Sequence, residues 1–176
     1  MSSTLTSMLA THPDDANAIG ASEKIWLTYG ALRQLSVEVR NSLRAKGIGA
    51  RDRVAIVLPN GDAMASAFIT IAQAATTAPL NPNYREDEFA FYLEDLAAKA
   101  IVLEAGYTGP AEAAAQRQGI AILRLQQDSN VAGKFSLLGE GGSAAAKEEL
   151  PDHNDVALIL HTSGTTSRPK IVPLWQ

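Results

Sequence analysis

The sequence predicts an α/β fold in which helices flank a parallel sheet. Short apolar runs alternate along the chain with segments that repeat apolar residues at helical spacing. The short runs consist of Val, Ile, Leu and Ala without polar interruption, as expected for strands covered on both faces. Such alternation indicates parallel strands joined by right-handed crossovers, and therefore parallel-sheet layers with flanking helices.

The first of these helices is expected to begin after Thr28, a typical N-cap residue, and to end at Gly47. Its apolar residues recur at spacings of three and four: Leu32, Leu35, Val39 and Leu43. The next apolar run, residues 54–58, is short and rich in β-branched side chains. We therefore expect it to be a buried strand.

Two further helices are expected after the Asn60-Gly61 turn. The first places a core face at helical spacing: Met64, Phe68, Ile71 and Ala75. The second has Asn83 as its expected N-cap and an acidic first turn, residues 86–88, which the helix dipole favours. It should run to about Lys99, and its expected buried side chains are Phe89, Tyr92, Leu93 and Leu96.

The second half of the chain continues the alternation. We expect a strand at residues 100–103, an Ala-rich helix closed by Gly119 and a strand at residues 120–125. Residues 126–153 are polar and rich in Gly and Ala, which indicates a long surface connection containing a short hairpin or helical turn. A last buried strand, residues 156–160, runs directly into the sequence HTSGTTSRPK.

The composition excludes several kinds of partner. The chain has 176 residues, of which 46% are hydrophobic and 19% charged, as in ordinary globular proteins. Its formal charge is −4 and its 15 Lys and Arg are scattered, so we expect neither a nucleic-acid face nor a membrane surface. It has no Cys, which favours a cytoplasmic protein. His153 and His161 lack a carboxylate pattern, so we expect no metal site and interpret His161 as a packed strand-end histidine.

The HTSGTTSRPK segment carries the chemistry that the rest of the chain lacks. Five hydroxyl side chains can donate hydrogen bonds, Gly164 allows backbone N–H groups to turn inward, and Lys170 adds a positive charge. Because this loop follows a buried strand, it should lie in the ligand-binding crevice of an α/β sheet. The expected phosphate contacts are Thr162, Ser163, Gly164, Thr165, Thr166, Ser167 and Lys170. The residue directly before Lys170 is Pro169 and not Gly, so the loop is not of the Walker type.

The segment TSGTTSRPK resembles the phosphate-binding loop, T-S-G-T-T-G-x-P-K-G, of the adenylate-forming superfamily of acyl-CoA synthetases, 4-coumarate–CoA ligases and luciferases. The family usually has Gly where this chain has Ser167 and Ile171, and we expect a stiffer loop because these residues avoid positive φ. The combination of HTSGTTS, VPL and PLNPNY is most similar to the oxalate–CoA ligase branch.

The resemblance implies that residues 1–176 are the N-terminal part of an AMP-binding domain, with residues 156–170 as strand plus phosphate-binding loop. The implied enzyme is an acid–CoA ligase that uses ATP, Mg²⁺ and coenzyme A on oxalate or another small carboxylic acid. We expect the later site residues and the C-terminal domain of such an enzyme to lie outside this chain, so that no catalytic set is complete in it and the chain alone is inactive. A peroxisomal address would lie in that missing part.

Two further expectations accompany this interpretation. Strand edges and apolar faces that would normally pack on later parts of the domain should make the chain self-associate. The alternative to a ligase is a noncatalytic phosphate- or nucleotide-binding module, or a partner-binding one, that ends at the loop.

Overall fold

The structure, a computed structural model, describes residues 4–139, 145–162 and 169–176. The helices in these ranges are α1 (Leu5–Leu9), α2 (Tyr29–Ala45), α3 (Asp62–Ala72), α4 (Glu86–Asp95) and α5 (Pro110–Gln118). The strands are β1 (Asn17–Ile19), β2 (Leu27–Thr28), β3 (Arg53–Val57), β4 (Thr76–Pro79), β5 (Ala100–Glu104), β6 (Ala121–Gln127), β7 (Phe135–Leu138), β8 (Val156–Thr162) and β9 (Lys170–Trp175).

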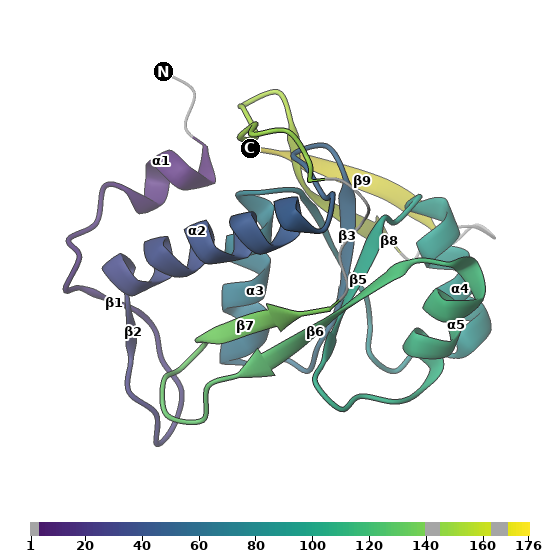
Figure 1. Cartoon of the computed structure of the whole chain (residues 1–176), viewed down its shortest axis with the longest axis horizontal. Helices are drawn as coiled ribbons and strands as arrows, with labels where there is room; N and C mark the ends of the chain where they lie inside the picture. Colours follow the sequence, from purple (N-terminus) through teal and green to yellow (C-terminus); the bar gives the residue numbers. More distant parts are fainter. Residues whose placement is uncertain (1–3, 140–144, 163–168) are drawn as a thin grey trace.

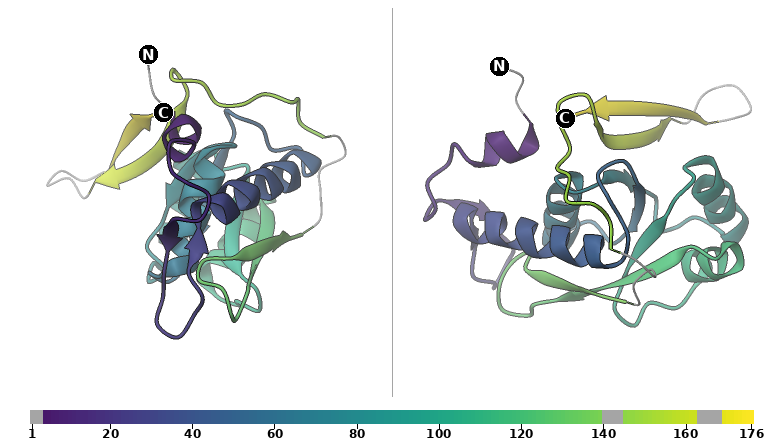
Figure 2. Two further views of the ribbon diagram at one scale, coloured as in Figure 1. Left: turned by 90° about the vertical axis from the view of Figure 1, so that its left-hand side faces the viewer. Right: turned by 45° about the horizontal axis from the view of Figure 1, so that its top comes forward.

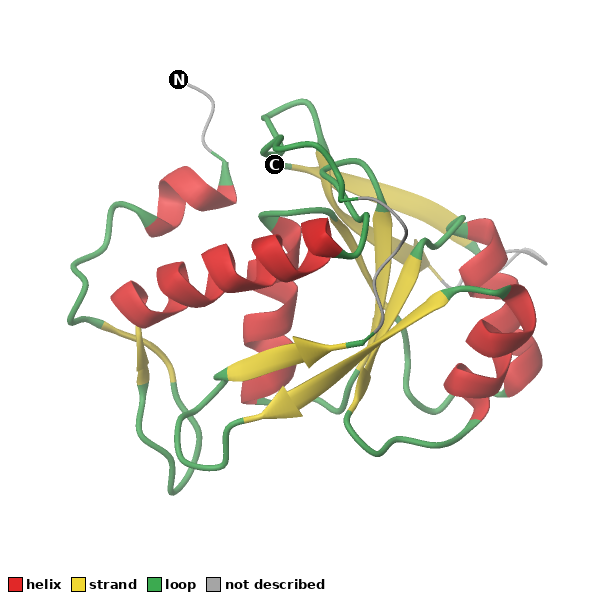
Figure 3. Ribbon diagram, in the orientation of Figure 1, coloured by secondary structure: helices red, strands yellow, loops and turns green. Residues whose placement is uncertain are grey.

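Seven of these strands form one sheet in the order β7-β6-β5-β3-β4-β8-β9, and β1 and β2 pair separately. The five inner strands run parallel, whereas the edge strands β7 and β9 are antiparallel to their neighbours. Helices α2 and α3 cover one face of the sheet and α4 and α5 the other (Figures 1 and 3). The predicted α/β class is confirmed.

The alternation of side chains along β3 divides the core into two layers. Val54 and Ile56 belong to the cluster that includes the buried residues of α2 and α3. Ala55 and Val57 point to the opposite face, where they share a cluster with Phe89 of α4. The unbroken apolar run in the sequence thus reflects a strand covered on both sides.

The ends of two helices agree with the residues expected there. The hydroxyl of Thr28 accepts a hydrogen bond from the N–H of Ala31 at 3.3 Å, which caps α2. Gly47, just beyond this helix, has φ 77°, and Gly119, the C-cap of α5, has φ 67°. Both glycines adopt the left-handed conformation in which other residues are strained.

Helix α4 begins later than expected. The predicted N-cap, Asn83, is wrong: its N–H is bonded to the side chain of Asn81 at 3.0 Å, in a turn that precedes the helix. The helix starts at Glu86, and Glu88 accepts a hydrogen bond from the N–H of Arg85 at 2.8 Å. The acidic first turn is confirmed, but it follows a different cap.

Two apolar faces also differ in part from the expectation. Helix α4 ends at Asp95, not near Lys99, because Ala97 takes a left-handed φ of 46°. Its expected buried residues are confirmed except Tyr92, which is half-buried.

In α3, Ile71 is buried, whereas Met64 and Phe68 are only half-buried. The buried side chains of this helix are otherwise small: Ala63, Ser66, Ala67, Thr70 and Ala72.

A polar contact ties three separate segments at the start of α3. Lys24, from the β1–β2 connection, donates to the carboxylate of Asp62 at 2.8 Å, and the N–H of Gly133 donates to the same oxygen at 2.8 Å. Burial opposes the charge on Asp62, but these hydrogen bonds outweigh it and lower the pKa of the carboxyl. Gly133 has φ 66°, and a Cβ there would lie 3.0 Å from the Asp62 carbonyl oxygen. The contact therefore requires glycine at this position.

Candidate functional site

The predicted loop lies between β8 and β9, which form an antiparallel hairpin at the edge of the sheet. Thr162 and Lys170 are paired residues in this hairpin, and both side chains are exposed. Directly opposed residues in an antiparallel pair point to the same face, so the hydroxyl and the ammonium flank the loop from one side. Figure 2 shows the hairpin standing out from the body of the molecule.

Only two of the predicted phosphate contacts can be placed. Thr162 ends β8 and Lys170 begins β9, whereas Ser163, Gly164, Thr165, Thr166 and Ser167 lie outside the described residues. Lys170 is expected at the end of the loop with no strand after it, but in the structure it is the first residue of β9.

One of the two departures from the family loop is compatible with the backbone found here. Ile171 lies in β9 opposite His161, in extended conformation. It therefore needs no positive φ, and a β-branched side chain suits this strand position. The expected stiffness of the loop stays a prediction. Ser167 lies outside the described residues.

The first half of β8 is held in the sheet by two threonine hydroxyls of β4. Thr76 donates to the carbonyl of Val156 at 2.7 Å, and Thr77 donates to the carbonyl of Ala157 at 2.8 Å. Thr77 is fully buried. These side chains supplement the backbone pairing of the two strands, whose register is defined by Thr77 and Leu158. The carboxyl end of β8 therefore lies on the same side of the sheet as the carboxyl ends of β3, β4 and β5, which is the side where α/β proteins bind ligands.

Behind the hairpin, aromatic side chains of the β4–α4 connection and α4 contact the end of β8. The ring of Tyr92 packs edge-on against His161, with centroids 4.7 Å apart, and stacks on Tyr84 at 4.8 Å. Burial raises the pKa of Tyr84 to about 12, and Tyr92 adds to the effect. Nε2 of His161 lies 3.1 Å from a carboxylate oxygen of Asp95. The expectation that His161 is a packed strand-end residue agrees with these contacts.

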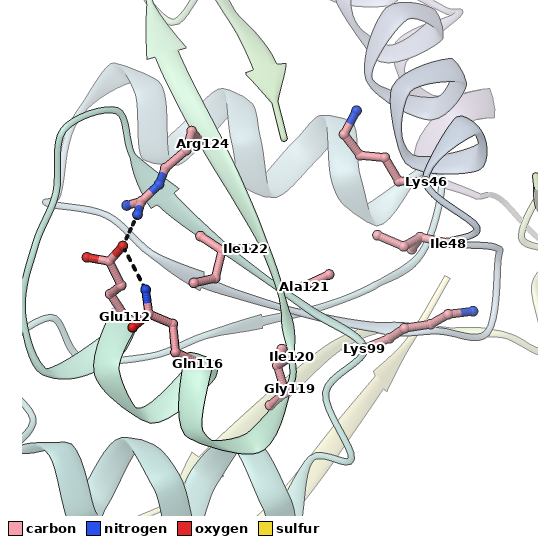
Figure 4. Close-up of a pocket in the computed structure, with 10 residues that line it drawn as sticks. All are labelled: Lys46, Ile48, Lys99, Glu112, Gln116, Gly119, Ile120, Ala121, Ile122 and Arg124. Atoms are coloured by element: carbon pink, nitrogen blue, oxygen red, sulfur yellow. Dashed lines mark hydrogen bonds and ion pairs between the residues drawn. The ribbon is translucent and has the colours of Figure 1, made fainter. Parts of the chain in front are cut away.

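A cleft of about 800 Å³ lies away from the loop. It opens at the beginning of β6, around Ala121, which is the opposite end of the parallel strands (Figure 4). Arg124 is paired with Glu112 in its wall, and Lys99 is paired with Asp52 at 2.8 Å. These two cations already have carboxylate partners, whereas Lys46, which also lines the cleft, donates to the hydroxyl of Ser42 at 3.4 Å.

The described ranges contain no group of three or more His, Cys, Asp or Glu residues suited to a metal ion. In the same ranges, no helix combines the length and hydrophobicity that a bilayer crossing demands.

Comparisons with known proteins agree with the fold. The chain is 36% identical to a protein of Humulus lupulus described as a probable CoA ligase, over 98% of this chain and 34% of that protein. It is 36% identical to an oxalate–CoA ligase of Arabidopsis thaliana, over 92% of this chain and 32% of that protein. It therefore spans about a third of the length of the curated relatives it matches.

Among solved structures, the ATP-bound MatB of Rhodopseudomonas palustris superposes with a TM-score of 0.75 at 26% identity, over 99% of this chain and 35% of that chain. The model of the family described as AMP-binding enzyme matches residues 6–176. The sheet, the strand that leads into the loop and this match over nearly the whole chain lead to one conclusion: the chain belongs to the family of AMP-binding enzymes.

Proposed function

We propose that this chain is the phosphate-binding portion of an ATP-dependent, AMP-forming acid–CoA ligase whose substrate is oxalate or another small carboxylic acid. The observation that carries the proposal is the hairpin in which Thr162 lies opposite Lys170, at the ligand-binding edge of a parallel sheet. Similarity to oxalate–CoA ligases of Arabidopsis thaliana and Saccharomyces cerevisiae, at 36% and 38% identity, supports the substrate class.

In the proposed reaction, the acid carboxylate attacks the α-phosphorus of ATP and pyrophosphate leaves. Coenzyme A then displaces AMP to form the thioester. The hydroxyl of Thr162 and the ammonium of Lys170 would hold the β- and γ-phosphates and stabilise the charge that develops on pyrophosphate. The remaining loop residues of this set are Ser163, Gly164, Thr165, Thr166 and Ser167.

The two described loop residues fit a polyphosphate. A hydroxyl donor and an exposed ammonium on one face of the hairpin suit phosphate oxygens, and neither has a carboxylate partner among the contacts of the described residues. Mg²⁺, when bound to the nucleotide, would supply further neutralisation of phosphate charge. The carboxylate, adenine and coenzyme A sites would lie in the remainder of the ligase, so we propose that the chain alone does not complete adenylation. We also propose that the ligase is cytoplasmic or peroxisomal.

The test is carboxylate-dependent exchange between ATP and pyrophosphate in the ligase that contains this chain, with oxalate, malonate and acetate as acids. We expect exchange with oxalate and a decrease of about 10- to 100-fold in kcat on Lys170→Ala, because the variant lacks a charge that acts on the leaving group. Lys147→Ala, an exposed lysine far along the chain from the loop, serves as control. No exchange with any of the acids would refute the ligase, and an unchanged rate in Lys170→Ala would refute the role of Lys170.

A second proposal concerns the chain on its own, and its partner is a second copy of the same chain. Strand β9 lies at the edge of the sheet, and its six residues are all exposed. One face of the hairpin carries the exposed apolar side chains of Leu160, Val172 and Leu174. Edge strands with apolar side chains pair readily with another strand, so we propose that two copies associate through β9.

A further inference from the structure

His161 is buried in a part of the molecule that is otherwise exposed. Its side chain is 5% exposed, although the neighbouring Thr162 and every residue of β9 are exposed. Successive residues of a strand point to opposite faces, so His161 points toward α4 while Thr162 points away from it. Figure 1 shows the loop end of the hairpin beside α4.

Within the described residues, the side-chain hydrogen bond and the aromatic contact of His161 both come from α4. Asp95, the last residue of α4, lies 3.1 Å from Nε2, and Tyr92, one turn earlier, contacts the imidazole ring edge-on. Because a carboxylate only accepts hydrogen bonds, Nε2 of His161 is the donor. Tyr92 is itself held by Tyr84, whose ring stacks on it with centroids 4.8 Å apart.

This contact lies beyond the last backbone pair that joins β8 to β4 in the part of the chain that the structure describes, and two residues beyond Ile159, whose buried side chain packs in the layer of α4 and α5. The threonine hydroxyls of β4 hold Val156 and Ala157, at the start of β8. The backbone pairing of β4 with β8 is defined at Thr77 and Leu158, and β4 ends at Pro79, which has no N–H to donate. Beyond that point, β8 pairs with β9, itself an edge strand. The bond from His161 to Asp95 is thus the side-chain tether of the loop end to α4.

We propose that His161 is a positioning residue for the phosphate-binding loop. Its hydrogen bond to Asp95 and its contact with Tyr92 fix the end of β8, and thereby the position of Thr162 opposite Lys170. A phosphate ligand then meets donors that are already in place, and its affinity is not reduced by the need to order the strand end. This proposal rests on the phosphate-binding function proposed above.

The experiment uses the 176-residue chain and inorganic pyrophosphate, with and without Mg²⁺, in an NMR titration that follows the backbone amides of Thr162 and Lys170. We expect Asp95→Ala and His161→Phe to weaken pyrophosphate binding by about fivefold or more, since hydrogen bonds to charged groups are strong. Asp95→Asn keeps an acceptor oxygen and should bind within about twofold of the unaltered chain. Glu94→Ala, an exposed neighbour on α4, is the matched control.

A second readout separates positioning from general stabilisation. In the unaltered chain and in Asp95→Asn, the Nε2 proton of His161 should be protected from exchange, and in Asp95→Ala it should exchange rapidly while the melting temperature matches that of Glu94→Ala. If His161→Phe fails to fold, Asp95→Ala carries the test, because the Asp95 side chain is 37% exposed.

The outcomes distinguish this proposal from the function on which it rests. The unaltered chain could bind pyrophosphate and Lys170→Ala lose this binding, while Asp95→Ala and His161→Phe bind as tightly as Glu94→Ala. That result would overturn the positioning role and leave the phosphate site intact. Loss of binding in Asp95→Asn as severe as in Asp95→Ala would also overturn it. No pyrophosphate binding by the unaltered chain would overturn the phosphate site, and the positioning role with it.

Discussion

Replacement of Thr77 by Val tests how the strand that carries the loop is held in the sheet. The substitution preserves the branched shape of the side chain but removes the hydroxyl that donates to the carbonyl of Ala157 at 2.8 Å. Thr77 is completely buried, so water does not replace the lost donor without local opening. Ala157 also lies where the register between β8 and β9 shifts. The backbone pairing of β8 with β9 is therefore irregular at Ala157, and the Thr77 hydroxyl supplies a larger share of the hydrogen bonding there.

The magnitude follows from two opposing contributions. A buried carbonyl left without its donor costs about 1–3 kcal/mol. The extra methyl group of Val buries apolar surface and recovers about 0.8 kcal/mol. We therefore expect Thr77→Val to lower the free energy of unfolding by about 0.2–2.2 kcal/mol. Because the lost bond joins β4 to β8, local opening should be easier in β8 than in β3.

Thr70→Val is the matched control. Thr70 is also fully buried, but its hydroxyl donates to the carbonyl of Ser66 within its own helix, at 2.8 Å. Urea denaturation would give the change in unfolding free energy, and amide hydrogen exchange would give the ratio of rates in β8 to those in β3. We expect this ratio to rise in Thr77→Val and to stay constant in Thr70→Val. Equal acceleration of both strands in Thr77→Val would refute the reasoning.

Two further perturbations test other parts of the structure. Asp62→Asn should lower the unfolding free energy by about 1–3 kcal/mol at pH 7, because Lys24 would lose a buried partner. The folded-state pKa of Asp62 is lowered, so the contribution of this carboxylate to the free energy of unfolding is present above about pH 4 and is lost as the pH falls through that lowered pKa. In urea titrations, a difference in unfolding free energy between the unaltered chain and Asp62→Asn that persists unchanged to pH 2 would contradict this. Leu174→Lys should shift the chain toward the monomer in light scattering, because it adds charge to the exposed edge strand, whereas Leu150→Lys, 52% exposed and outside β9, should not. Equal association of both variants would exclude β9 as the contact.

The sequence was sufficient for elements whose signal is local. The apolar runs at residues 54–58 and 100–103 became β3 and β5, because a continuous apolar segment is stable only where both faces are covered. Gly119 ended α5 in the left-handed conformation that a glycine there indicates. These features depend on residues close together in the chain, and a single sequence therefore displays them.

Elements that depend on distant partners were not predicted. Strand β4 has the sequence Thr-Thr-Ala-Pro, which shows neither an apolar run nor an alternation, and it is held by hydroxyl bonds to residues 80 positions away. Strand β9 contains Pro173 and is stabilised by its antiparallel pairing with β8. In both strands the stabilising contact is absent from the local pattern, so propensity alone underestimates them.

The loop illustrates the same division at the candidate site. Its hydroxyls and Lys170 identify it from the sequence, yet the pairing that places Thr162 opposite Lys170 depends on supports outside the motif. One support is β4 at the start of β8, and the other is Asp95, which is 66 positions from His161. We therefore expect a substitution in α4 to change the proposed phosphate binding while every residue of the motif is retained. On the phosphate-binding and positioning roles proposed above, we expect the affinity of this loop for phosphate to depend on the sheet edge and α4 together, and not on loop sequence alone.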